Sequence, residues 1–263
     1  MTVHIEQRTS RLAGWSRLTA YFAAVLLLVA GAAHRFGLLQ TGDFLSVLAL
    51  TAALAVLALV FASLSFRRVW TRGDLGAADI AKGTLVGLAV LAPFGLALFW
   101  GLTRPPLNDV STDTVDPPRF VRAVGDRTFG MNPIRPIGGA SARLQAEAYP
   151  EVTGRRYAAP DDRVLATVLN LIERHSWRLL SDPRGELDDP EVTVEALART
   201  FILGFPSDVA IRVTDEGGTT YVDMRSASRY GNRDLGDNAE RVAGFLGELD
   251  AEMATQAGAP PAE

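Results

Sequence analysis

The 263-residue sequence predicts an α+β soluble domain attached to an all-α anchor of three transmembrane helices. Three observations support this fold class. The first 103 residues contain three uncharged apolar stretches, residues 104–160 are dense in proline, and the rest alternates strand-like segments with two amphipathic helices. We therefore divide the chain into an anchor (1–103), a Pro-rich wrap (104–160), an α+β domain (161–253) and a disordered tail (254–263).

The three uncharged stretches are Leu18–Ala33, Phe44–Phe66 and Gly83–Thr103. A helix needs about 20 mostly apolar residues to cross a bilayer, so the second and third stretches predict spans directly. Because no ionisable residue lies in their interiors, attachment is favoured over transport. His34 is expected to reach the interface, and close helix packing is expected at Gly83, Gly87 and Gly95.

The first stretch also resembles a secretory signal, because basic residues precede it and Ala30-Gly31-Ala32 ends it. Its length and the closely following second span favour a retained helix. In either case, basic residues concentrate before the first span and between the second and third, at Arg8, Arg11, Arg17, Arg67, Arg68, Arg72 and Lys82. The positive-inside rule then predicts a multi-pass protein of the bacterial inner (cytoplasmic) membrane, with a cytoplasmic N-terminus and a periplasmic or extracytoplasmic C-terminal domain.

Charge is distributed unevenly between the anchor and the remainder. The first 103 residues carry eight basic and four acidic side chains, whereas the remaining residues carry 18 basic and 26 acidic ones. An acidic domain is unsuited to nucleic acid, whose binding depends on neutralising phosphates, so no nucleic-acid partner is expected. The chain has no cysteine, which excludes disulfides and thiol catalysis.

The Pro-rich wrap contains more than half of the prolines, which disfavours long regular elements. It also contains isolated aromatic residues at Phe120, Phe129, Tyr149 and Tyr157. A disordered linker rarely carries such large apolar groups. We therefore expect this segment to be ordered, mostly irregular and draped over the domain.

The elements of the folded domain follow from residue spacing. A helix is predicted from Asp161, its N-cap candidate, because apolar residues recur on one face. A final helix is predicted from Asp237, which forms a capping-box-like pair with Glu240. Between them, four strands of a mostly antiparallel sheet are predicted at Trp177–Ser181, Val192–Ile202, Asp208–Thr214 and Thr220–Ser228, with a hairpin at Asp215–Gly218.

Alternation along the strands gives the sheet two different faces. The apolar face, which the two helices are expected to cover, comprises Val194, Ala196, Ala198, Val209, Ile211, Val213, Val222 and Met224. The opposite face is charged and comprises Glu195, Arg199, Asp208, Arg212, Asp223, Arg225 and Arg229. This charged face has two interpretations. It is either a ladder of cross-strand ion pairs, solvated or covered by the wrap, or an arginine cluster that captures a carboxylate or phosphate.

Catalytic and metal-binding patterns are sparse. His4, His34 and His175 are too scattered to form a metal cluster, and His175 is expected at a helix C-terminus. The sequence lacks a nucleophile elbow, a phosphate loop and a dinucleotide fingerprint. Loop carboxylates at Asp109, Asp113 and Asp116 are more typical of turn caps than of cation ligands. No metal and no cofactor are expected.

Several motifs together resemble an uncharacterised family, the domain of unknown function 1499. They are Asn108–Asp113 with Asp116-Pro117-Pro118, Ala198-Arg199-Thr200 with Gly204-Phe205, Asp208–Val213, and Asp223–Arg229 running into Gly231, Asp234-Leu235-Gly236, Asn238 and Arg241. The resemblance covers about residues 107–249. It implies a compact α+β domain at a membrane and supplies no catalytic residue.

The loop between the last strand and the last helix offers a second anion site, because helix N-termini attract anions. Arg225, Arg229, Arg233, Asn238 and Arg241 surround this loop in sequence, although Asp234 and Asp237 are expected to cap the helix themselves.

We therefore expect a non-enzymatic envelope module that binds a protein partner, lipid headgroup or small anion, with the lipid bilayer as a further partner. The candidate ligand-binding residues are Arg199, Arg212, Arg225, Arg229, Asn238 and Arg241. The alternative is a hydrolase or transferase at the membrane surface that uses Asp208, Asp223 or Asp234, so the sequence leaves enzymatic activity open.

Overall fold

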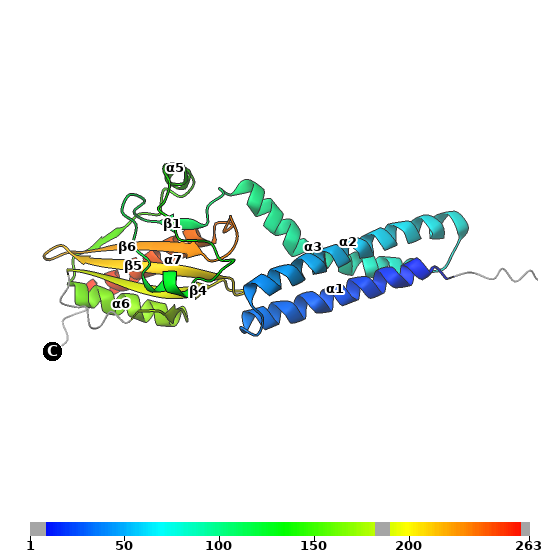
Figure 1. The fold of residues 1–263 in the computed structure, drawn as a ribbon, viewed down its shortest axis with the longest axis horizontal. Helices are drawn as coiled ribbons and strands as arrows, with labels where there is room; N and C mark the ends of the chain where they lie inside the picture. Colours follow the sequence, from blue (N-terminus) through cyan, green and yellow to red (C-terminus); the bar gives the residue numbers. More distant parts are fainter. Residues whose placement is uncertain (1–8, 182–189, 259–263) are drawn as a thin grey trace, which may run out of the picture. The chain divides into compact units, whose positions relative to one another are not determined.

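A computed structural model describes residues 9–181 and 190–258. The chain forms two compact units, Met1–Trp100 and Gly101–Glu263 (Figure 1). The predicted fold class is confirmed, because three long apolar helices precede a domain with an antiparallel sheet and helices.

The first unit contains the long helices α1 (Arg11–Arg35) and α2 (Thr41–Arg72) and most of α3 (Ala77–Thr103). All three are long and apolar enough to cross a membrane. Gly83 lies against Ser16 of α1 and Gly87 against Leu59 of α2, so both glycines allow the close packing expected of them. Gly95 has no such neighbour within 4 Å. The His34 side chain is buried, stacks on Phe44 and has its Nε2 2.9 Å from the Thr41 hydroxyl, so it packs within this unit and does not extend away from the helices.

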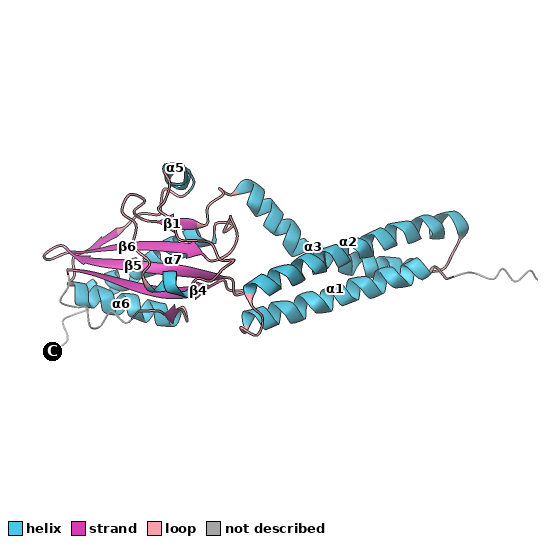
Figure 2. Cartoon of the chain, in the orientation of Figure 1, coloured by secondary structure: helices cyan, strands magenta, loops and turns pink. Residues whose placement is uncertain are grey.

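The second unit is built on a six-stranded antiparallel sheet (Figure 2). The strands are β1 (Asp109–Ser111), β2 (Arg155–Tyr157), β3 (Arg178–Leu179), β4 (Glu191–Arg199), β5 (Pro206–Asp215) and β6 (Thr220–Ser228). Their order is β1-β6-β5-β4-β3, and β2 also pairs with β6. The sequence predicts only four strands, because β1 and β2 lie within the Pro-rich segment and are too short to show a period of two.

Helices α6 (Asp161–Arg174) and α7 (Asp237–Gly258) cover the apolar face of the sheet, as predicted. Their apolar residues form one core with the strands, in which Val168, Phe245 and Leu249 are fully or almost fully buried with Ile211 and Met224. The predicted hairpin joins β5 to β6, where the Asp215 carboxylate accepts a hydrogen bond from the Gly217 N–H. His175 occupies the C-cap of α6, as expected.

The Pro-rich segment covers the opposite face of the sheet. Besides β1 and β2 it contains α4 (Arg122–Asp126) and α5 (Gly139–Ala148), so it is more regular than the sequence predicts. Phe120 and Ala123 are buried against Ala210 and Ala227 of the sheet, whereas Phe129 is fully exposed. This second small core fixes the segment to the charged face.

The boundaries of several predicted elements need correction. The β4 strand ends at Arg199 instead of Ile202, because residues 200–205 turn through Gly204, whose φ is +75°. Pro160, not Asp161, is the N-cap of α6.

At the start of α7 the capping carboxylate is Asp234, which accepts from the N–H groups of Gly236 and Asn238, so the expected Asp237 and Glu240 box does not form the cap. The predicted tail begins too early, since α7 continues to Gly258 and Gln256 donates to Thr167 of α6. Residues 259–263 lie outside the described residues, as does His4.

Candidate functional site

The charged face of the sheet is a buried network of ion pairs. Arg212 of β5 lies directly opposite Asp223 of β6 in the strand register, and its Nη2 lies 2.8 Å from Asp223 Oδ2. Arg229 donates from both Nε and Nη2 to Asp208 Oδ1, at 2.9 and 2.6 Å. Asp208 and Asp223 are fully buried, and both arginines are less than a tenth exposed.

The Pro-rich segment supplies the remaining partners of these charges. Asp109 binds Arg225 through two parallel hydrogen bonds of 2.9 and 2.7 Å, and Asp116 lies 3.0 Å from Arg212 Nη1. Arg127 donates to the second oxygen of Asp208 at 2.8 Å.

These contacts join four arginines to four aspartates, so each of the four guanidinium groups has a carboxylate partner within the domain. Asp126 of α4 also lies 3.8 Å from Arg229 Nη2. Bidentate hydrogen bonds such as those of Arg225 to Asp109 are the strong form of such pairs.

Glu195, a further carboxylate on this face, binds backbone donors instead of an arginine. Its two oxygens accept hydrogen bonds from the N–H groups of Val121, Arg122 and Ala123, at 2.8 to 2.9 Å. These are the free donors at the start of α4, which attract a negative charge. The wrap is therefore fastened to β4 as well as to β5 and β6.

The pKa of Arg212 reflects this environment. Burial disfavours its charged form, but hydrogen bonds to Asp223 and Asp116 outweigh burial and raise the pKa above its ordinary value. Arg212 is therefore a permanent cation whose charge the protein itself neutralises. An external anion would have to displace one of these two carboxylates.

The six predicted ligand-binding residues do not converge on one surface. Arg212, Arg225 and Arg229 lie under the wrap, while Arg199 is exposed at the end of β4 and donates to the Gly204 carbonyl. Asn238 and Arg241 belong to α7, on the opposite side of the sheet. There they contact the Ser226 hydroxyl, and Asn238 Nδ2 also donates to Ser228 Oγ at 3.0 Å.

The carboxylates of the enzymatic alternative are also occupied. Asp208 and Asp223 accept from buried arginines, and Asp234 caps α7. Burial raises the pKa of Asp234, and the hydrogen bonds from Gly236 and Asn238 oppose that shift. These three carboxylates have structural partners, and none of them lines either of the two pockets below.

Metal ligands are not grouped in the part of the chain that the structure describes, since no three His, Asp or Glu side chains there could hold an ion. Asp113 accepts from the N–H groups of Val115 and Asp116 and so stabilises a turn. His175 lies 3.1 Å from a Glu248 oxygen.

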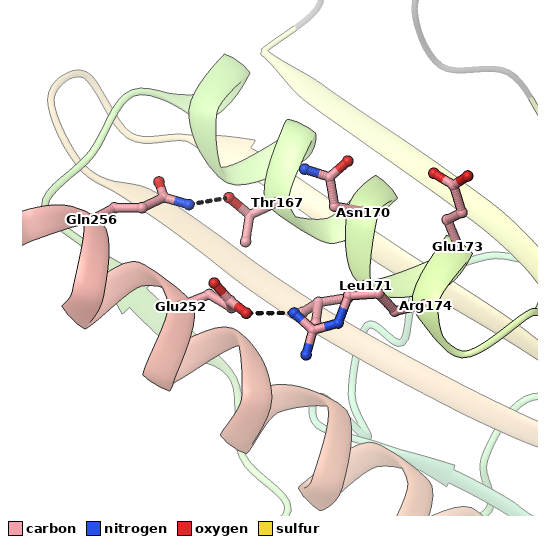
Figure 3. A pocket seen from close by; sticks show the side chains of 7 residues that line it. All are labelled: Thr167, Asn170, Leu171, Glu173, Arg174, Glu252 and Gln256. Atoms are coloured by element: carbon pink, nitrogen blue, oxygen red, sulfur yellow. Dashed lines mark hydrogen bonds and ion pairs between the residues drawn. The ribbon is translucent and has the colours of Figure 1, made fainter. Parts of the chain in front are cut away.

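One pocket, of about 520 Å³, lies between α6 and α7 (Figure 3). Its lining is Thr167, Asn170, Leu171, Glu173, Arg174, Glu252 and Gln256. Two interactions bridge it, an ion pair of Arg174 with Glu252 and a hydrogen bond from Gln256 to Thr167. Its polar groups thus serve largely to join the two helices.

A second pocket, of about 350 Å³, lies between the start of β1, the segment before α5 and the loop after β6; we call it the β1–α5 pocket. Its lining is Pro106, Leu107, Asn108, Asp109, Asn132, Pro133, Arg135, Pro136, Ile137, Gly138, Ser141 and Asn232. Arg135 is exposed, and within residues 9–181 and 190–258 its guanidinium has no hydrogen-bond or ion-pair partner. Its carbonyl, in contrast, accepts from Arg225 at 2.9 Å.

Sequence reasoning missed the β1–α5 pocket. The sequence offered one signal, the prolines Pro133 and Pro136 on either side of Arg135. Prolines favour an extended chain without ladder hydrogen bonds, which indicates an irregular segment around Arg135. Nothing in the spacing indicated that this segment meets Asn108 and Asn232, which are distant in sequence.

Together, the three apolar helices and the ion-paired α+β domain define a membrane-anchored domain protein. A family model described as "Protein of unknown function (DUF1499)" matches residues 109–249. Because the match covers more than half of the chain, the chain belongs to this family, and the resemblance drawn from its motifs is confirmed. No curated protein and no solved structure matches the chain.

Proposed function

We propose that this membrane-anchored protein is a non-enzymatic binding module whose β1–α5 pocket receives an anionic group. The observation that carries the proposal is the Arg135 guanidinium, which lines the pocket without a partner among the described residues. The other charged lining residue, Asp109, is already neutralised by Arg225. The pocket therefore presents an uncompensated positive charge.

The remaining lining fits a small ligand. Proline, Leu107 and Ile137 side chains give apolar walls, while Asn108, Asn132, Ser141 and Asn232 supply hydrogen-bonding groups. Ligand sites combine mostly apolar walls with a few polar groups in this way, in volumes of about 300 to 1,000 Å³. The α5 helix also begins here, and no side chain caps its first turn, so its N–H groups add to the attraction for an anion.

In this proposal the arginines predicted as an anion-recognition face have a structural role. Arg212 and Arg225 bind the wrap through Asp116 and Asp109, and Arg229 binds Asp208 of β5, which also accepts from Arg127 of the wrap. These contacts position the pocket beside β1. Arg135 replaces them as the group that meets the ligand.

We further propose a bacterial inner-membrane location, with the N-terminus in the cytoplasm and the domain on the outer side. The excess of basic residues before α1 and between α2 and α3 supports this orientation. A periplasm-active reporter fused after Gly258, or between α1 and α2 at Leu39, should be active. Activity from a cytoplasm-only reporter after Gly258 would overturn the orientation.

Ligand binding is tested with the full chain in detergent micelles. Thermal melts are recorded with inorganic phosphate, glycerol 3-phosphate as a headgroup mimic, and acetate as a carboxylate. A ligand at 100 times its Kd stabilises the folded state by about 2.7 kcal/mol, which is measurable as a rise in Tm. Comparing the three anions separates a phosphate or headgroup ligand from a carboxylate.

The matched variants are Arg135→Gln and Arg119→Gln, which remove the same charge from two exposed positions. Arg119 does not line the pocket. Arg135→Gln should abolish the anion-dependent rise in Tm, whereas Arg119→Gln should retain it. Equal behaviour of the two variants, or no rise in wild type with any of the three anions, would refute the proposal.

A further inference from the structure

The turn between β4 and β5, residues 200–205, exposes large apolar side chains; we call it the hairpin tip. Phe201 is 90% exposed and Ile202 is 78% exposed. The turn is nevertheless well bonded, because the Phe205 N–H donates to the Thr200 hydroxyl at 2.9 Å and the Gly204 N–H to the Thr200 carbonyl at 3.0 Å. A defined turn thus holds apolar surface away from the core, which is unfavourable in water.

A second exposed aromatic residue belongs to the same end of the sheet. Phe129 is fully exposed beside Gly130, whose φ is +92°. Three residues later, the Asn132 N–H donates to the Arg229 carbonyl, and the Arg229 N–H donates to the carbonyl of Pro206, where β5 begins. The Phe129 turn and the hairpin tip therefore both lie at the end of the sheet where β5 begins.

The chain enters the domain at this same end. Asp109 of β1 pairs with Ala227 of β6, and Ser207 of β5 pairs with Ser228 of β6, so the start of β1 and the start of β5 lie on either side of the end of β6. Six residues lead from the end of α3 at Thr103 to Asp109. They can span at most about 20 Å. The start of β1 is therefore held close to the end of the third apolar helix.

Hydrogen bonds tighten this connection within the second unit. Arg233, in the loop after β6, donates to the Gly101 carbonyl in the last turn of α3. Arg104 lies 2.8 Å from a Glu240 oxygen and also donates to the Leu235 carbonyl. The loop after β6 is thus joined to the end of α3. Because neighbouring strands of the sheet are only about 4.8 Å apart, the start of β5, next to β6, lies close to this loop.

We propose that the hairpin tip and Phe129 insert into the interfacial region of the bilayer that anchors the chain. Apolar and aromatic side chains gain free energy when they leave water for this region. The lipid contact holds the domain in one orientation on the membrane surface.

The test uses the full chain in vesicles of phosphatidylcholine and phosphatidylglycerol. Because the chain has no cysteine, one introduced cysteine carries an environment-sensitive dye at a single site. The test positions are Ile202→Cys and Phe129→Cys. The matched controls are Val115→Cys, a 94% exposed apolar residue beyond the far end of β1, and Thr219→Cys in the opposite hairpin.

At Ile202 and Phe129 the dye emission should move to shorter wavelength than at Val115 and Thr219. A nitroxide on the lipid acyl chain should quench it, and aqueous iodide should not. Quenching by iodide at Ile202, to the same extent as at the controls, would overturn the proposal. Protection from iodide without acyl-chain quenching would also overturn it, because the side chain would then be covered by protein.

Discussion

Removing Asp109 should strongly destabilise the domain, because Arg225 would lose the one carboxylate that it binds among residues 9–181 and 190–258. The Arg225 side chain is 5% exposed and is held by two hydrogen bonds to Asp109. Breaking a buried ion pair costs about 3 to 5 kcal/mol. Since Asp109 is 22% exposed and the carbonyl oxygens of Arg135 and Pro118 still face Arg225, we expect about 2 to 4 kcal/mol for Asp109→Ala.

The matched control is Asp116→Ala. Asp116 also belongs to the wrap and pairs with a buried arginine, but its side chain is 64% exposed and Arg212 keeps Asp223. An exposed pair of this kind contributes about 0 to 1 kcal/mol. The two variants therefore remove the same side chain from similar positions and differ in whether a buried cation is left unpaired.

The assay is urea unfolding of the fragment 101–263, followed by circular dichroism. With a slope of about 1 to 3 kcal/mol per M urea, a loss of about 2 to 4 kcal/mol in Asp109→Ala should lower the midpoint by roughly 0.7 to 4 M. The double variant Asp109→Leu with Arg225→Met should recover most of the loss, because it removes both charges. Equal losses in Asp109→Ala and Asp116→Ala would refute the reasoning.

Three further predictions concern the same domain. The fragment 101–263 should fold cooperatively as a monomer, whereas the fragment 161–263 should not, because it lacks Asp109, Asp116 and Arg127 from the buried network. Thermal melts of the two fragments test this, and equal melting temperatures would contradict the stabilising role of the wrap. Arg225→Lys should cost about 1 to 3 kcal/mol even without ligand, since an ammonium cannot reproduce the two parallel bonds to Asp109. The exposed control Arg119→Lys should change the free energy of unfolding by less than about 0.5 kcal/mol; equilibrium unfolding compares the two variants, and a stable Arg225→Lys would be the contrary outcome. For Asp234, burial raises the folded pKa above its ordinary value, so the folded state binds the proton more tightly and loses stability as the pH rises through that pKa. The stability of Asp234→Asn relative to wild type should therefore increase between about pH 4 and about pH 7, and a constant or falling difference in urea unfolding would disprove it.

The sequence alone determined the elements whose physical cause is local. The three apolar helices follow from the residue composition that a bilayer demands, and the β5–β6 hairpin from glycines at Gly217 and Gly218. The helix-covered face of the sheet follows from alternation in β4, β5 and β6, whose register confirms which side chains share a face. Family membership also came from the sequence, because each of its motifs is a short continuous string of residues that can be read without the fold.

Only the tertiary structure decided how the charged face is used. Alternation showed that Arg212, Arg225 and Arg229 share a face, but their partners Asp109 and Asp116 are about a hundred residues away in the chain. No local pattern encodes such a pairing, because the two segments meet only when β1 adds to the edge of β6. The same applies to the β1–α5 pocket, whose lining residues come from segments separated by about a hundred positions.

The string from Asp223 to Arg241 shows the limit of reading proximity from sequence. Arg225 and Ser226 are neighbours in the chain, yet the alternation of a strand directs Arg225 to Asp109 beneath the wrap and Ser226 to Asn238 of α7. Residues grouped by sequence as one anion site therefore lie on opposite faces of the sheet. The sequence determined which face each side chain occupies. The folding of distant segments onto that face determined whether a charged side chain is exposed, neutralised or open to a ligand.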